Sequence, residues 1–221
     1  MCWSAEVSFG TLVCGTLLNA GTYLLLRRRT RLIAILWYWQ YALLMQIPEG
    51  IAWLQLAGGA RDIAPVSAIA LLLNTTQPLA LLATLRFGTG SNRHFPAAAA
   101  ASVMYAALLL TDGLWRSVDI APQPGCSHLE LRYWNVSRTT SYVLASVAGF
   151  AAVPDGAWAA VNAAIFLGAL AVALLASSCG VGSLFCWLIA FTAPILLATH
   201  ALSRVRVVWS TRGGPIRLVL A

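Results

Sequence analysis

Long apolar stretches alternate with short polar segments along the chain. A helix needs roughly 20 apolar residues to cross a hydrocarbon core about 30 Å thick, and seven stretches approach this length. The pattern therefore predicts an all-α fold: a polytopic membrane protein whose seven-transmembrane-helix bundle forms a single membrane domain over residues 1–221. The predicted spans are residues 6–26, 32–56, 63–85, 96–114, 139–153, 157–177 and 182–202, and the fifth is the shortest.

The arginines lie mainly at the ends of these stretches and predict an orientation. Cytoplasmic loops of membrane proteins carry an excess of basic residues. If the N-terminus lies outside, ten of the 14 arginines fall on the inner side, and the four on the outer side are Arg61, Arg116, Arg132 and Arg138. We therefore expect the N-terminus outside and the C-terminus inside, which requires an odd number of spans.

The composition supports an integral, multi-pass membrane protein, although it leaves open which membrane is the host. Hydrophobic residues make up 60% of the chain and charged residues 10%, against roughly 25% charged residues in a typical soluble domain. The formal net charge is +7, and every basic residue is Arg, so chemistry that needs Lys is excluded. The arginines flank apolar stretches, so we expect the lipid bilayer and other membrane proteins or further copies as partners, and no nucleic acid.

The second predicted span contains a carboxylate and an amide on one helical face. Gln46 and Glu49 are three residues apart, a spacing that places them side by side. Pro48 lies between them and leaves the carbonyl of Leu44 without its usual helical donor. Ionisable side chains within a membrane span are costly and mark functional sites, so Glu49 is the sharpest candidate of the chain.

The third span repeats this pattern with Asn74, Gln77 and Pro78. Two proline-interrupted helices that carry amides and one carboxylate are typical of a polar cavity in a transporter. This hypothesis assigns a substrate or ion pathway to Gln46, Glu49, Asn74 and Gln77. The alternative is structural, because buried amides also join membrane helices through hydrogen bonds worth about 0.6 kcal/mol each.

The candidate chemistry favours transport over catalysis. The three histidines, His94, His128 and His200, fall in different segments, and no catalytic triad, carboxylate pair or metal cluster has usable spacing. We therefore expect no enzyme, no cofactor and no metal. The first hypothesis is a small-solute or ion-coupled transporter, and the alternative is a non-catalytic structural or accessory subunit of a larger membrane complex.

Several residues on the predicted outer side are candidates for covalent modification. Cys2, Cys126 and Cys179 all map there, so two of them can form a disulfide in an oxidising compartment, or all can be free thiols. Asn135 begins the glycosylation sequon Asn-Val-Ser in the longest outer loop.

The tryptophans and the small residues predict how the spans are placed. Trp37, Trp39, Trp158 and Trp209 fall near the inner boundary and the other tryptophans near the outer one, as interfacial belts do, although packing between helices is the rival explanation. Small residues recur every four positions and predict close helix packing. They are Ser141, Ala145 and Gly149 in the fifth span, and Ala164 and Gly168 in the sixth.

The opening motif Met1-Cys2-Trp3-Ser4 resembles an uncharacterised family of seven-helix membrane proteins that begin with Met-Cys-Trp-Ser. That family carries Met-Glu-x-x-Gln in its second span, and this chain has Met45-Gln46-Ile47-Pro48-Glu49, with acid and amide exchanged. The family also ends a third-span motif with Phe-Gln-Pro, and this chain has Thr76-Gln77-Pro78 without the preceding His of the family. The resemblance implies seven helices and does not imply an activity.

Overall fold

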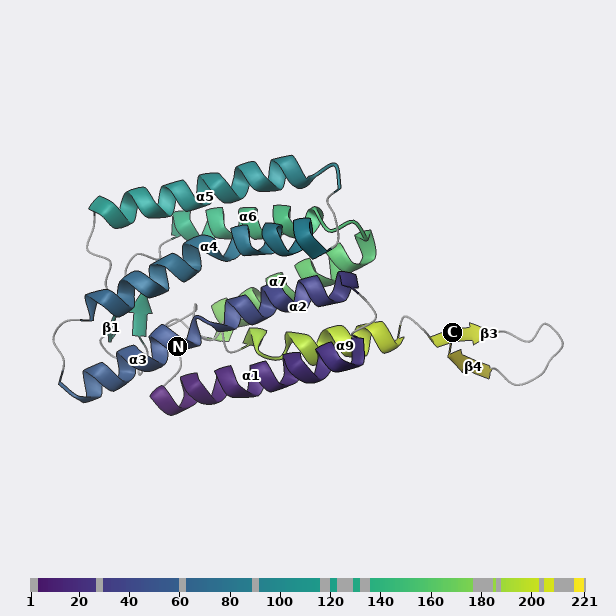
Figure 1. The fold of residues 1–221 in the computed structure, drawn as a ribbon, viewed down its shortest axis with the longest axis horizontal. Coiled ribbons are helices and arrows are strands. Elements are labelled where there is room, and N and C mark those ends of the chain that lie inside the picture. The colour runs from purple at the N-terminus through teal and green to yellow at the C-terminus, as the bar shows by residue number, and fades with distance from the viewer. Residues whose placement is uncertain are drawn as a thin grey trace.

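The protein is built mainly from helices that run alongside one another, as its computed structural model shows (Figure 1). The structure describes residues 4–26, 30–59, 63–88, 92–115, 120–122, 129–131, 136–176, 185, 188–202, 205–208 and 217–220. The helices are α1 (Ala5–Leu26), α2 (Thr30–Leu43), α3 (Gln46–Ala57), α4 (Ala64–Gly88), α5 (Phe95–Trp115), α6 (Val136–Ala151), α7 (Gly156–Ala176) and α9 (Thr192–Leu202).

Two short antiparallel hairpins accompany the helices. The first, β1 (Ile120–Pro122) with β2 (Leu129–Leu131), follows α5 and precedes α6. The second, β3 (Val205–Val208) with β4 (Arg217–Leu220), follows α9 and extends away from the helices (Figure 1). The hydrophobic pattern predicts neither hairpin, because strands of three or four residues are too short to show a clear alternation.

The helical class predicted from the sequence is confirmed, since each predicted span contains at least one described helix. Within the described residues, three helical segments are long and apolar enough to cross a membrane: Ala5–Leu26, Ala64–Gly88 and Gly156–Leu175. The apolar segment Phe95–Thr111 of α5 is shorter. α6 begins at Val136, earlier than the fifth predicted span, and buries Arg138 in its first turn.

The second predicted span, residues 32–56, is not one continuous helix. α2 ends at Leu43, a turn comes next, and α3 begins at Gln46. The carbonyl of Leu44 accepts a hydrogen bond from the amide of Ile47 at 3.0 Å, one residue short of the α-helical partner. That partner is Pro48, which has no N–H to donate, so the chain changes its hydrogen-bond pattern at this point.

The last predicted span, residues 182–202, is also interrupted by a turn. Ala190 and Phe191 form a turn before α9 begins, and the amide of Phe191 donates to the carbonyl of Leu188 at 3.2 Å. Pro194 follows the turn at the same distance at which Pro48 follows the turn after α2. In both places, the two turn residues lie four and three residues before a proline.

Buried and exposed side chains are distributed on α1 in the opposite sense to a soluble helix. Its buried face carries small and polar residues: Ser8, Thr11, Gly15, Asn19 and Thr22. Its exposed face carries large apolar residues, namely Val13, Leu17, Leu24 and Leu25. Small and hydroxyl-bearing residues let membrane helices approach closely, whereas exposed apolar side chains suit a lipid environment.

The small-residue faces predicted for close packing have different outcomes. A Cβ added at Gly149 of α6 would lie 2.6 Å from Cδ2 of Leu81 on α4, so that face is packed as predicted. Gly168 of α7 has open space around it, and Ala164 is exposed. The prediction of a packing face at these two residues is therefore wrong, because small-residue spacing does not say which side of a helix meets a neighbour.

The centre of the helix bundle is an aromatic cluster. Its rings lie with centroids 4.9 to 5.9 Å apart and join α2, α5, α6 and α7 with Phe185. The cluster consists of Tyr38, Trp39, Tyr105, Tyr142, Phe150, Phe166 and Phe185. Trp39 is 1% exposed, so its prediction as an interfacial residue is wrong and packing between helices explains it. Trp37, two residues earlier, is 60% exposed.

Candidate functional site at two helix breaks

The two broken helices meet at Gly15 on α1. A Cβ at this position would lie 2.7 Å from Cδ1 of Leu43, the last residue of α2, and 3.3 Å from Cβ of Ala190 in the second turn. Any side chain would therefore push against both breaks. Gly15 lies near the middle of the 22-residue α1, so both interruptions fall at mid-length of that helix.

Glu49 and Gln46 lie directly after the first break, in the first turn of α3, and both are 0% exposed. The N-terminus of a helix carries a partial positive charge that stabilises a carboxylate. Next to them, a Cβ at Gly50 would lie 2.7 Å from Cζ of Phe9 on α1. The backbone beside Glu49 is therefore closed by an aromatic ring, and the acid is held inside the protein.

The neighbouring face of α1 adds hydroxyl groups. Ser8 is fully buried, and within the described residues its hydroxyl has no hydrogen-bond partner. Thr11 is also buried and donates to the carbonyl of Val7, 2.7 Å away, in its own helix. Buried amide, carboxylate and hydroxyl groups can bind a proton, a small cation or a hydrogen-bonding solute.

Asn74 and Gln77 are also buried, at the middle of α4, but proline does not break this helix. The carbonyl of Asn74, which Pro78 leaves without its helical donor, accepts a hydrogen bond from the hydroxyl of Tyr105 on α5 at 3.4 Å. The hydroxyl of Tyr142 on α6 donates to Oε1 of Gln77 at 2.5 Å. Gln77 is therefore directed towards α6, and its contact favours the structural interpretation of this residue.

Replacing Tyr142 with Phe is expected to lower the free energy of unfolding by about 0.6 to 1.7 kcal/mol, because Gln77 loses its buried donor. Unfolding of the purified protein in mixed micelles with increasing denaturing detergent measures this change. Tyr23→Phe is the control, since it is the same substitution at a side chain that is 42% exposed. Equal stability of the two variants would contradict an energetic role for this hydrogen bond.

Two further interhelical hydrogen bonds tie α2 to the bundle. Nε1 of Trp39 donates to Oδ1 of Asn162 on α7 at 3.0 Å, and Asn162 is fully buried. The hydroxyl groups of Tyr41 and Thr76 lie 2.6 Å apart and join α2 to α4. The sequence signal for these contacts is only the presence of polar atoms within apolar stretches, which does not identify partners.

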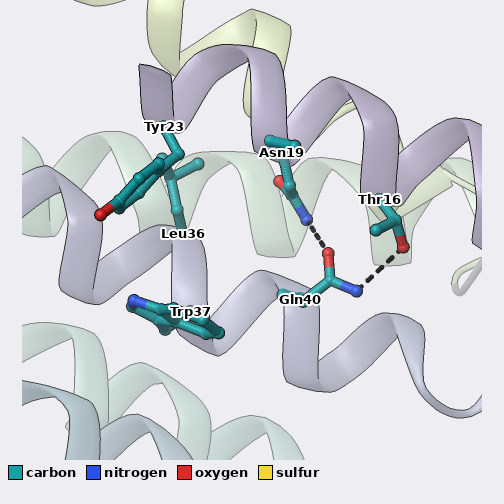
Figure 2. A pocket seen from close by; sticks show the side chains of 7 residues that line it. Thr16, Asn19, Tyr23, Leu36, Trp37 and Gln40 are labelled. Atoms are coloured by element: carbon teal, nitrogen blue, oxygen red, sulfur yellow. Dashed lines mark hydrogen bonds between the residues drawn. The ribbon is translucent and has the colours of Figure 1, made fainter. Parts of the chain in front are cut away.

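Two pockets open beside α2, and neither is lined by the four residues predicted for a pathway. The first, of about 410 Å³, lies between α1 and α2 and is lined by Thr16, Asn19, Ala20, Tyr23, Leu36, Trp37 and Gln40 (Figure 2). The second, of about 480 Å³, lies between α2 and α4 and is lined by Ile33, Ala34, Trp37, Ala83, Thr84, Phe87 and Gly88.

The candidate modification sites lie outside the described residues. These are Cys2, Cys126 and Cys179 for a disulfide and Asn135 for glycosylation. Cys14 is described and is an exposed free thiol. Within the part of the chain that the structure describes, no three His, Cys, Asp or Glu residues gather in a way that could hold a metal ion.

Comparisons with known protein families, with curated proteins and with solved structures find no match to this chain. The resemblance carried by the N-terminal motif therefore stays a prediction. The geometry of the site is the basis on which function is inferred.

Proposed function

We propose that the protein is an integral membrane protein that crosses the bilayer seven times, with its N-terminus outside. In the part of the chain that the structure describes, three helical segments have the length and apolar character that a crossing needs. The polar, small face of α1 is turned inward, and Leu17, Leu24 and Leu25 are turned outward, as expected for a helix that faces lipid. The arginine distribution supports the orientation.

We further propose that it is a small-solute transporter coupled to a proton or a small cation at Glu49. The observation that supports this proposal is that two broken helices meet at Gly15, and that a buried carboxylate lies in the first turn after one of the breaks. Discontinuous helices at mid-depth are typical of transporters, because the breaks present backbone polar groups to a bound solute or ion. They also give each half-helix freedom to move relative to the other.

The chemistry of the site suggests how coupling works. A charged carboxylate within a membrane is costly in free energy. Binding of a proton or a cation to Glu49 would neutralise it before access to the site changes from one side of the membrane to the other. Gln46 in the same turn of α3 and Ser8 on the packed face of α1 offer buried, uncharged hydrogen-bonding groups, which suit a polar, uncharged solute. Movement of the half-helices against α1 would then expose the site to one side at a time.

Flux into sealed proteoliposomes, across a panel of small polar solutes and ions, tests this proposal. We expect wild type to move at least one of them in response to a pH or cation gradient. Glu49→Gln should lose the coupled flux by roughly tenfold or more while staying folded, because the amide can neither lose a proton nor neutralise a cation. Glu6→Gln is the matched control, since Glu6 is an exposed carboxylate in the first turn of α1.

Two results would contradict transport at this site. Flux that is equal in wild type and Glu49→Gln would remove Glu49 from the pathway. Absence of flux in folded, correctly inserted wild type would favour the accessory-subunit alternative, which co-purification of membrane partners in mild detergent would then examine.

A further inference from the structure

The pocket between α1 and α2 has a polar end and an apolar remainder. The amide of Asn19 donates from Nδ2 to Oε1 of Gln40 at 2.9 Å, and Nε2 of Gln40 donates to the hydroxyl oxygen of Thr16 at 3.0 Å (Figure 2). Tyr23, Leu36 and Trp37 form most of the remaining wall. A volume of about 410 Å³ falls within the range of small-molecule sites.

One acceptor in this pocket has no partner within the described residues. Asn19 is only 7% exposed, and its buried Oδ1 accepts no hydrogen bond from any described residue. The oxygen lies on the side of the carboxamide turned away from Gln40 (Figure 2). A buried acceptor left unsatisfied costs about 1 to 3 kcal/mol. The oxygen has almost no exposed surface in this conformation, so a ligand donor in the pocket gains that energy when the Asn19 carboxamide turns towards it.

The hydrogen-bonded chain can also run in the opposite direction. If the Thr16 hydroxyl donates to Gln40 and Gln40 donates to Asn19, the NH₂ group of Asn19 becomes the free group instead. Asn19 can therefore present either an acceptor or a donor to the pocket. A hydroxyl group is the matching ligand group, because it can both donate and accept.

From these observations we propose that the α1–α2 pocket binds a neutral amphiphile, with one hydroxyl group at Asn19 and an apolar body along Tyr23, Leu36 and Trp37. None of the seven lining residues carries a charge, which disfavours a phosphate or carboxylate head group. Trp37 is 60% exposed, so the pocket opens to the outside of the helix bundle. This outside is lipid if the proposed membrane insertion holds, and a sterol or a long-chain alcohol can enter from it.

Photolabelling in bilayer nanodiscs tests the site, using diazirine-bearing versions of a sterol and of a linear fatty alcohol. We expect saturable labelling of α1 and α2 by at least one of these probes. The probe that labels the protein shows whether the hydroxyl group belongs to a sterol or to a linear alcohol. The deoxy analogue, which keeps the apolar body, should compete at least tenfold less well, as expected for the loss of one buried hydrogen bond.

Variants test the polar contact and the space in the pocket separately. Asn19→Leu keeps the branched shape of the side chain and should weaken labelling by roughly tenfold, since it removes the hydrogen-bonding group. Ala20→Phe places a ring in the pocket from an exposed position and should abolish labelling in a folded protein. Gln55→Ala is the control, because it removes an amide of α3 that does not line this pocket.

The proposal is overturned if no probe labels α1 or α2, if the deoxy analogue competes equally, or if labelling survives Ala20→Phe. Labelling requires no solute flux, so it can succeed where the transport proposal fails. Resistance of the protein to alkaline extraction from membranes checks insertion separately.

Discussion

Truncation of Trp39 to Ala is expected to lower the free energy of unfolding by roughly 3 to 5 kcal/mol, the usual range for a buried aromatic residue. Trp39 is 1% exposed, and its ring stacks on Phe150 with a centroid distance of 5.9 Å and an interplanar angle of 26°. The variant also removes the donor to Asn162 on α7. Denaturing-detergent titration of the purified protein, followed by circular dichroism, measures the change.

Two other variants divide this effect into its parts. Trp39→Phe keeps a ring in the cluster and removes the indole donor, so it should cost about 0.6 to 1.7 kcal/mol. Trp37→Ala is the matched control two residues away, and because Trp37 is 60% exposed it should change stability far less. Similar losses for Trp37→Ala and Trp39→Ala would show that the aromatic cluster does not dominate the packing of α2.

The substitution Gly15→Leu is expected to disrupt the junction of the two broken helices. A Cβ at this position already lies 2.7 Å from Leu43 and 3.3 Å from Ala190, and Leu43 is itself 0% exposed. Overpacking of a close contact typically costs about 1 to 3 kcal/mol and occasionally more, and a whole leucine side chain lies at the upper end. Gly15→Ala should be milder, because the end of the Leu43 side chain can turn aside and Ala190, 3.3 Å from the added Cβ, has to shift only slightly.

The control for this prediction is Gly10→Leu on the same helix. Gly10 has nothing within 4 Å of an added Cβ, and replacing a helical Gly normally gains up to about 1 kcal/mol in helix propensity. Folded yield and thermal unfolding in detergent measure both variants. If Gly15→Leu is as stable as Gly10→Leu, α1 does not press against the two breaks as described.

Within the proposed transport function, Gly15→Leu would also fix the breaks against α1. The milder Gly15→Ala variant is therefore useful in the flux assay, since it should reduce the transport rate before it reduces folded yield. A rate that is unchanged in Gly15→Ala would indicate that the junction does not move during transport.

The helical class and the approximate positions of the helices follow from the sequence alone, because apolar length and periodicity act locally. The sequence also determines where helical hydrogen bonds are lost, since a proline removes its own N–H whatever surrounds it. The three-residue spacing of Gln46 and Glu49 predicts that they share one helical face, and the structure places both, fully buried, in the first turn of α3.

The effect of each proline on its helix depends on contacts with other helices. Pro48 and Pro194 each come after a break, whereas Pro78 does not, and at Pro78 a hydroxyl from Tyr105 on α5 supplies the missing donor. Likewise, Trp39 is a core residue and Trp37 a surface residue because α6 and α7 cover one side of α2 only. These outcomes depend on contacts between helices far apart in the chain, which no local pattern of residues specifies.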